Sequence, residues 1–278
     1  MKRKICADSS CDLTSLTGAC FAVAPLKIIT DLCEFVDTDE LETADMLLHL
    51  ESYNGRSRTS CPNVDDWIMT FGDEEEIFAV TITSGLSGSF NSATVAAEKY
   101  TAQHPKRRVR VVDTLSVGPE SALIIEKLRE LIDKDEPFDE ISRMIDEYMK
   151  KTRLIFSLES MKNLANNGRV SHVAARMAGL LGIRAIGTAS DKGVLDMTDK
   201  VRGETGTLRT IIKNMEDAGY SGGKVRIHHV KNQSAAYSLE KMLRERWREA
   251  DISIRDARGL CSFYAERGGI LVGFETNL

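Results

Sequence analysis

A strand, a small-residue turn and a helix follow one another in the most regular stretch of hydrophobic and polar positions along the chain. Residues 77–82 are apolar and mostly β-branched, which is typical of a buried strand. The turn 84–89 reads S-G-L-S-G-S, and the predicted helix 90–100 places three alanines on one side. Ligands in open α/β sheets bind past the carboxyl ends of the strands, so the turn is either a binding loop or a set of helix caps.

The same alternation of strand and helix extends over the first half of the chain. Predicted strands occupy residues 4–7, 21–29 and 109–112. The second of these is interrupted by Pro25, which indicates an edge or a bulge. Predicted helices begin at Thr43, at Pro62-Asn63 and at Pro137, and another spans 122–132. This pattern predicts a parallel-sheet α/β domain over residues 1–151.

The second half loses the strict alternation, and this predicts an α+β domain over residues 152–278. A strand at 154–156 precedes a helix face made by Leu158, Met161, Leu164 and Ala165, which Gly168 ends as a left-handed cap. A further helix runs from Ser171 to Leu181. The remaining expected elements are a hairpin of 183–189 and 194–197 around Asp191-Lys192-Gly193, a helix after Arg202, strands at 225–230, 252–254 and 270–274, and a helix at 235–247.

Composition and charge exclude several classes of protein. The 278 residues are 42% hydrophobic and 28% charged, with a net charge of −5, so we expect no nucleic-acid partner. No apolar run approaches the roughly 20 residues of a membrane span, and no long apolar leader follows Met1, so we expect a cytoplasmic protein. The six cysteines have neither C-x-x-C nor zinc spacing, and we expect no metal.

Two kinds of enzyme have sequence motifs that can be compared with this chain. The turn around Ser87 resembles the nucleophile elbow G-x-S-x-G of serine hydrolases, except that Ser89 replaces the last glycine. The adjacent His228 and His229 lie in a predicted strand, so at most one of them faces a given site. No phosphate-binding loop or dinucleotide fingerprint is present, and we expect no nucleotide cofactor.

Hydroxyl-rich loops remain as the principal candidate for chemistry. They comprise residues 8–10, 59–60 and 84–89, each following or preceding a predicted element of the first domain. Arg169 and Arg202 come from the second domain, and together these groups describe an anion pocket between two domains. Apolar residues of the second domain are candidates for a cavity wall: Met161, Leu164, Met177, Leu180 and Leu181.

Seven short motifs resemble, in order and spacing, those of the DegV family. They are Asp8-Ser9-Ser10, Pro25-Leu26, Thr59-Ser60-x-Pro62, residues 84–89, Asp113-Thr114, Gly168-Arg169-Val170-Ser171 and Lys200-Val201-Arg202. The resemblance implies a two-domain α/β protein that binds one long-chain fatty acid in a buried tunnel. It also implies a non-catalytic role, in some members as the acyl-binding subunit that presents the carboxylate to a separate ATP-dependent fatty acid kinase subunit.

The resemblance also assigns roles to residues of this chain. It implies that Thr59 and Ser87 hold the carboxylate, and that Arg169 and Arg202 belong to the surrounding polar network or to the partner surface. Tyr264 stands where the family has a histidine, and it can donate a hydrogen bond without carrying a positive charge. Cys61 stands where the family has glutamine, and Ile183-Arg184-Ala185 replaces Leu-Lys-Pro. The predicted ligand-binding residues are Thr59, Ser60, Ser84, Ser87, Gly88, Ser89, Arg169, Arg202 and Tyr264.

The sequence therefore predicts a cytoplasmic fatty-acid-binding protein without a catalytic residue, a cofactor or a metal. Two alternatives stay open at this point. One is an esterase-like serine hydrolase that uses Ser87, and the other is a lipid-sensing regulatory protein.

Overall fold

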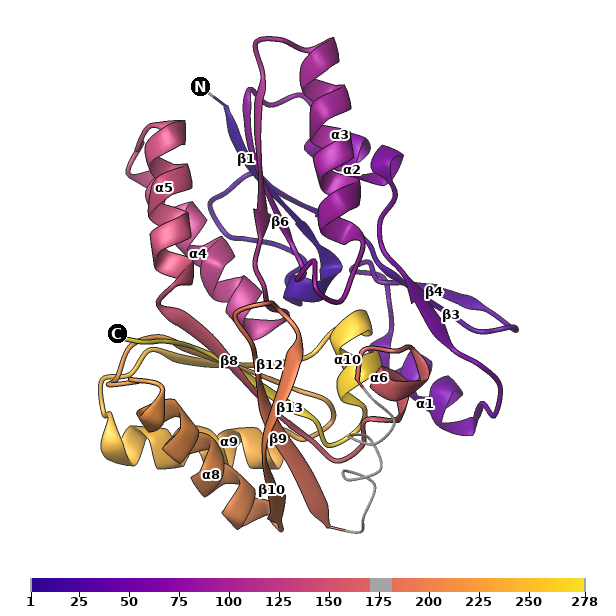
Figure 1. Ribbon diagram of the computed structural model, residues 1–278, viewed down its shortest axis with the longest axis vertical. Coiled ribbons are helices and arrows are strands. Elements are labelled where there is room, and N and C mark those ends of the chain that lie inside the picture. The colour runs from indigo at the N-terminus through magenta and orange to yellow at the C-terminus, as the bar shows by residue number, and fades with distance from the viewer. Residues whose placement is uncertain (1, 171–181, 278) are drawn as a thin grey trace.

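Four parallel strands form the sheet at the top of Figure 1, which shows the computed structural model; the structure describes residues 2–170 and 182–277. The strand order is β2 (Phe21–Ala24), β1 (Arg3–Asp8), β6 (Glu76–Thr81) and β7 (Arg108–Asp113). Helices α2 (Val64–Phe71) and α3 (Ser89–Gln103) cover one face, and α4 (Pro119–Asp133) and α5 (Phe138–Met149) cover the other. The predicted parallel α/β arrangement of the first half is confirmed.

The second sheet contains six strands and is mixed, as expected for the second half. Its order is β10 (Leu195–Arg202), β9 (Ile183–Ala189), β8 (Thr152–Leu158), β13 (Ile270–Glu275), β11 (Val225–His229) and β12 (Ile252–Asp256). Strand β13 runs antiparallel to both of its neighbours, whereas β11 and β12 are parallel. Helices α8 (Glu204–Asp217) and α9 (Gln233–Arg246) bury one face. Helices α6 (Lys162–Asn166) and α10 (Gly259–Ala265) pack on the other face.

A small third sheet brings a segment of the first half onto the second. Strands β4 (Glu34–Val36), β3 (Lys27–Ile29) and β5 (Arg58–Ser60) pair antiparallel, and helix α1 (Thr43–Ser52) connects β4 to β5. Ile28 of β3 and Met46 of α1 are fully buried in one hydrophobic cluster with Phe156 of the six-stranded sheet. This core therefore draws on both sides of the predicted division at residue 151.

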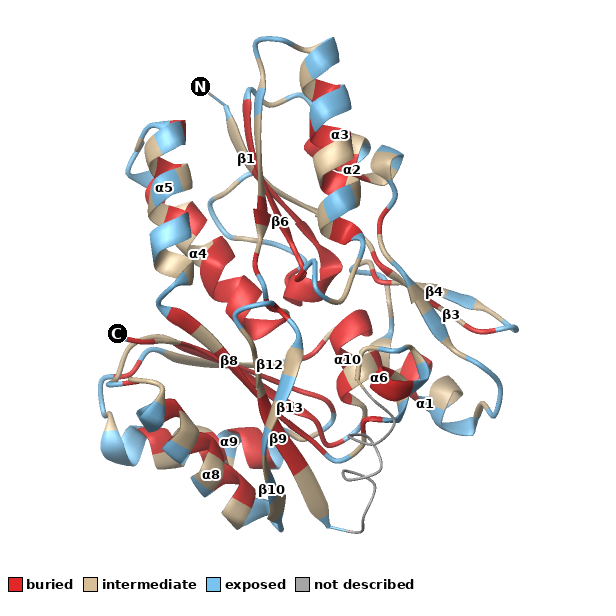
Figure 2. Cartoon of the chain, viewed as in Figure 1, coloured by how far each residue is buried: buried red, intermediate tan, exposed pale blue. Residues whose placement is uncertain are grey.

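Helix α4 joins the two large sheets, and Figure 2 shows its buried surface between them. Ile124 and Leu128 point into the core of the parallel sheet. On the side of the second sheet, the Arg226 guanidinium of β11 donates to Glu126 of α4 over 2.7 and 2.8 Å. A second cross-link is the buried pair of His228 Nδ1 and Asp12, which are 2.7 Å apart. These contacts fix the space between the sheets, where the candidate site lies.

Several predicted element boundaries differ from the structure. Residues 21–29 form two strands in different sheets, because Pro25 has no N–H to continue the ladder. Glu42 rather than Thr43 is the N-cap of α1, whereas the predicted helix start at Pro62-Asn63 is confirmed, since Asn63 caps α2 through a capping box with Asp66. Leu158 ends strand β8 instead of starting a helix face, since β8 pairs as far as Leu158 with β9.

The predicted hairpin and the left-handed cap at Gly168 are confirmed. Strands β9 and β10 pair antiparallel, and Gly168 has a φ of +72°. Lys200, Val201 and Arg202 lie inside β10, whereas the predicted helix from Ser171 to Leu181 lies outside the described residues. Across 2–170 and 182–277, no helix combines the length and the apolar character needed to cross a bilayer. The same residues contain no group of three or more metal-ligating side chains in reach of one ion.

Candidate functional site

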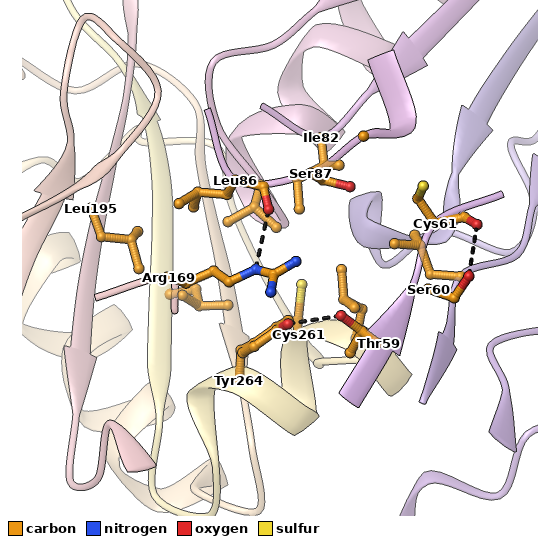
Figure 3. Close-up of a pocket in the computed structure, with 15 residues that line it drawn as sticks. Thr59, Ser60, Cys61, Ile82, Leu86, Ser87, Arg169, Leu195, Cys261 and Tyr264 are labelled. Carbon is orange, nitrogen blue, oxygen red and sulfur yellow. Dashed lines mark hydrogen bonds between the residues drawn. The ribbon is translucent and has the colours of Figure 1, made fainter. Parts of the chain in front are cut away.

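A cavity of about 340 Å³ lies where the parallel sheet, the six-stranded sheet and the small sheet meet. Segments from both halves of the chain supply its walls, and Figure 3 draws the lining residues. They are strands β5, β10 and β13, helix α10, the turn between β6 and α3, the turn after α6, and the connections from β2 to β3 and from β7 to α4. The volume falls within the range of about 300–1,000 Å³ that is typical of small-molecule sites.

The predicted residues Thr59 and Tyr264 meet at one end of this cavity. Thr59 belongs to β5 and Tyr264 to α10, and their hydroxyl oxygens are 2.8 Å apart, so one hydroxyl donates to the other (Figure 3). Burial raises the pKa of Tyr264, which therefore keeps its proton at neutral pH. Thr59 lies within a strand and caps no helix, so its hydroxyl is available as a polar group of the cavity wall.

Arg169 brings a positive charge to the same end. Its Nε donates to the Leu86 carbonyl at 3.2 Å, and its guanidinium lies 5.9 Å from the centre of the Tyr264 ring. Arg169 is only partly exposed, and among the described residues no carboxylate comes within ion-pair distance of it. A half-buried cation without an acidic partner favours an anionic ligand.

The turn after β6 adds a helix N-terminus to this polar end. Gly88 is the N-cap of α3, and the hydroxyl of Ser87 accepts a hydrogen bond from the Ser89 N–H at 3.3 Å. Both Ser87 and Gly88 line the cavity, as does Ser60. The first N–H groups of a helix and its dipole stabilise negative charge, so the turn is suited to an oxyanion.

The rest of the cavity wall is hydrophobic. Its apolar side chains come from two strands of the six-stranded sheet, from helix α10 and from the connections of the first half: Leu26, Ile82, Leu86, Val117, Leu195, Leu260 and Leu271. Two thiols, those of Cys61 and Cys261, also line it, and burial raises the pKa of both. A polar end with a cation and a long apolar wall together fit an amphipathic anion.

Three of the predicted site residues lie elsewhere. Ser84 is exposed, and its N–H donates to Asp113 at 3.0 Å. The buried Ser89 hydroxyl donates to Asp8 at 2.6 Å, and Arg202 is exposed at the end of β10. Of the residues predicted as the apolar wall, Met161 and Leu164 belong to a hydrophobic core cluster rather than to the cavity lining, and Met177, Leu180 and Leu181 lie outside the described residues.

The Asp8-Ser9-Ser10 motif lies behind the cavity and orders its loops. The Asp8 carboxylate is buried, and it accepts hydrogen bonds from the Ser10 hydroxyl, the Ser89 hydroxyl and the Ile82 N–H. Burial raises the pKa of Asp8 despite these donors. The motif thereby ties the strand β1 to the turn that carries Ser87, and it acts on the site through packing rather than by contact with a ligand.

The hydrolase alternative lacks a base at Ser87. His228 points to Asp12, and His229 Nδ1 lies 3.4 Å from Asp256, so neither imidazole reaches the cavity. Within the described parts of the chain, Ser87 has no histidine, lysine or carboxylate as a hydrogen-bond partner. A serine hydroxyl needs such a base to become a nucleophile, so the geometry favours binding over hydrolysis.

The missed residues of the site are mainly apolar. Leu195, Leu260 and Leu271 line the cavity, yet in the sequence they are indistinguishable from core positions. The residues around them in the sequence do not distinguish the two cases, because a cavity wall and a packed core have the same hydrophobic pattern.

Fold and site together define an α/β protein with an amphipathic cavity where its three sheets meet. The family model described as "Uncharacterised protein, DegV family" matches residues 2–277, and the chain belongs to this family. A DegV domain-containing protein of Streptococcus pneumoniae is 39% identical over 279 aligned residues, covering 99% of each chain.

Two solved structures resemble this chain over its whole length. A DegV family protein from Eubacterium eligens, loaded with heptadecanoic acid, is 46% identical with a TM-score of 0.97, covering 99% of this chain and 100% of that one. The Streptococcus pneumoniae fatty acid kinase (Fak) B3 protein, loaded with linoleic acid, is 38% identical with a TM-score of 0.98, covering 100% of both. Both structures contain a bound fatty acid, and one of the two proteins is named as part of a fatty acid kinase. The comparisons therefore support neither a hydrolase nor a lipid-sensing regulator.

Proposed function

We propose that this protein binds one long-chain fatty acid in the cavity between its sheets. The observation that carries the proposal is that one cavity combines an apolar wall with Arg169, whose hydrogen-bond acceptors among the described residues are backbone carbonyls and not a carboxylate. Burying an acyl chain contributes about 0.8 kcal/mol per methylene, which gives ample gross affinity for a long chain. The bound lipids of the two full-length structural relatives support the same ligand class.

In this proposal the carboxylate lies at the polar end and the acyl chain follows the leucine-rich wall. Thr59 and Ser87 donate hydrogen bonds to the carboxylate, Arg169 balances its charge, and the N-terminus of α3 adds N–H groups. Tyr264 supports Thr59 by holding its hydroxyl at 2.8 Å. A buried carboxylate needs such paired donors, because an unpaired charge in an apolar cavity is strongly destabilised.

Mass spectrometry tests the ligand directly. Native spectra and organic extraction of the purified protein should give close to one acyl chain per polypeptide. The matched variants are Val117→Trp, which fills the cavity, and Met69→Trp, which adds the same ring at a position that is 73% exposed. Val117→Trp should lose the lipid while Met69→Trp keeps it. A nucleotide or sugar in the wild type, or full lipid occupancy of Val117→Trp, contradicts the proposal.

We further propose that the loaded protein presents the carboxylate to a separate ATP-dependent kinase subunit. The full-length similarity to a protein described as part of fatty acid kinase supports this role. Exposed Arg202 is the candidate contact for that subunit. Incubation with a fatty acid kinase catalytic subunit and ATP, followed by trapping with hydroxylamine, should yield an acyl hydroxamate. Lipid binding without any hydroxamate would leave the binding role and refute the kinase role.

A cytoplasmic location completes the proposal. All six cysteines are free thiols, and such a set is typical of a reducing compartment. No cofactor enters the proposed role.

A further inference from the structure

The tip of the β9–β10 hairpin is fastened to the parallel sheet beside the cavity. The Thr83 hydroxyl donates to the Gly193 carbonyl at 2.7 Å, and Thr83 is 1% exposed. The Thr83 backbone is itself held, because its N–H donates to the Ser116 carbonyl at 2.9 Å. The hairpin belongs to the six-stranded sheet, so this hydrogen bond joins the two sheets at the end of strand β6 (Figure 1).

The two surfaces approach each other closely at this contact. Gly193 has a φ of +68°, and a Cβ on it would lie 1.9 Å from the Thr83 hydroxyl oxygen. A Cβ on Gly85 would lie 2.8 Å from the Lys192 carbonyl oxygen. Since real side chains do not tolerate such distances, glycine is required at positions 85 and 193 for the hairpin tip to pack against the turn.

The contact closes one wall of the cavity. Leu195 follows Gly193 by two residues and Leu86 follows Gly85 directly, and both leucines line the cavity (Figure 3). Behind the tip, the pairing of β10 with β9 shifts register between Met197 and Asp199. Strands bend at such irregularities, so the tip has a site about which it can swing.

We propose that Thr83 and Gly193 form a clasp that sets the rate at which a fatty acid enters and leaves the cavity. The inference rests on the proposed function and adds a positioning role for two residues that do not line the cavity themselves. Separation of the hairpin tip from the turn 83–85 moves Leu195 away from Leu86 and opens the wall. In this proposal the hydrogen bond is formed in the empty and in the loaded protein alike, so breaking it speeds entry and exit to the same degree and leaves the affinity unchanged.

Stopped-flow fluorescence with the polyene fatty acid cis-parinaric acid tests the clasp. Thr83→Val keeps the shape of the side chain and removes both its donor to the Gly193 carbonyl and its acceptor for the Gly85 N–H, which lies at 3.0 Å. Both the association and the dissociation rate constants should rise by about two- to thirteenfold, the effect of one lost hydrogen bond. Thr83→Ser should restore the wild-type rates. Thr81→Val is the matched control, because the Thr81 hydroxyl donates to Val112 and does not contact the hairpin.

Gly85→Ala provides a second perturbation that removes no donor. Its methyl group displaces the Lys192 and Gly193 carbonyls, so exchange should again accelerate with the dissociation constant unchanged. Unchanged rates in both variants overturn the clasp. A faster dissociation with an unchanged association rate also overturns it, because the contact would then contribute to affinity. Failure of the wild type to bind any parinaric acid overturns the proposed function itself.

Discussion

The hydrogen bond between Thr59 and Tyr264 makes a quantitative prediction about the polar end of the cavity. Tyr264→Phe keeps the ring and removes one neutral hydrogen bond of 2.8 Å. Such a bond contributes about 0.5–1.5 kcal/mol, so the dissociation constant for a fatty acid should rise by about two- to thirteenfold. The loss is modest because, in the proposed binding mode, Thr59, Ser87 and Arg169 still contact the carboxylate.

Thr59→Val has the larger expected effect although the two side chains have nearly the same shape. The valine removes a donor to a charged group, an interaction worth about 1.5–3 kcal/mol, and the dissociation constant should rise by about 10- to 150-fold. It also leaves the largely buried Tyr264 hydroxyl without its partner. The double variant should show less than the sum of the two effects, because both substitutions break the same hydrogen bond.

Competition between a fluorescent fatty acid and one natural fatty acid gives the dissociation constants of the wild type, the two single variants and the double variant under the same conditions. Thr101→Val is the control, because the Thr101 hydroxyl donates to the Ala97 carbonyl on the surface of α3, away from the cavity. Its dissociation constant should equal that of the wild type. If Tyr264→Phe proves more damaging than Thr59→Val, the carboxylate does not lie between the Thr59 and Ser87 loops.

Three further predictions follow from the charged groups and their environments. Arg169→Gln should weaken fatty acid binding by at least about tenfold and reduce the salt dependence of binding, which is measured as the slope of affinity against ionic strength. An unchanged slope would show that Arg169 does not interact with the charge of the ligand. Burial raises the pKa of Asp37 to about 6, so the folded state retains a proton that the unfolded state has released. Its contribution to stability should therefore fall as the pH rises from about 4 to 6 and stay constant above. In denaturant titrations across this interval, the free energy of unfolding of the wild type should decline relative to Asp37→Asn, and a constant difference would contradict the assignment. Ser89→Ala should lower the free energy of unfolding by about 1–3 kcal/mol, because it removes a donor from the buried Asp8 carboxylate; a loss of lipid binding with unchanged stability would show instead that Ser89 contacts the ligand.

Local pattern was sufficient for the elements of the parallel sheet and for the hydroxyl-bearing part of the site. The run 77–82 became β6, and the turn after it carries Ser87 and Gly88 on the cavity wall. Such features are encoded within a few residues, since strand periodicity, small-residue turns and helix starts depend on neighbours in the chain. Six of the nine predicted ligand-binding residues line one cavity, and Thr59, Arg169 and Tyr264 among them were indicated by the resemblance to the DegV family rather than by local pattern.

Pairing between distant segments was decided by the tertiary structure. Thr59 and Tyr264 are 205 positions apart, and only the packing of α10 beside β3 and β5 brings their hydroxyls together. Likewise, Ser84 and Ser89 share the turn with Ser87, yet one faces solvent and the other faces Asp8. The direction in which a side chain of a turn points depends on the backbone path between the ends of the turn, and the amino-acid composition of the turn does not specify that path.

The apolar wall and the clasp mark the limit of sequence reasoning most clearly. Leu195 lines a cavity whereas Ile186 on the neighbouring strand is packed in a core, although both are aliphatic residues in strands. Whether a hydrophobic side chain meets another side chain or an open volume depends on how sheets and helices close around it. The sequence by itself determined a parallel α/β first half, a second half of mixed strands and helices, and a small-residue turn after β6, because each depends on neighbours in the chain. The closure of those halves decided where a fatty acid fits.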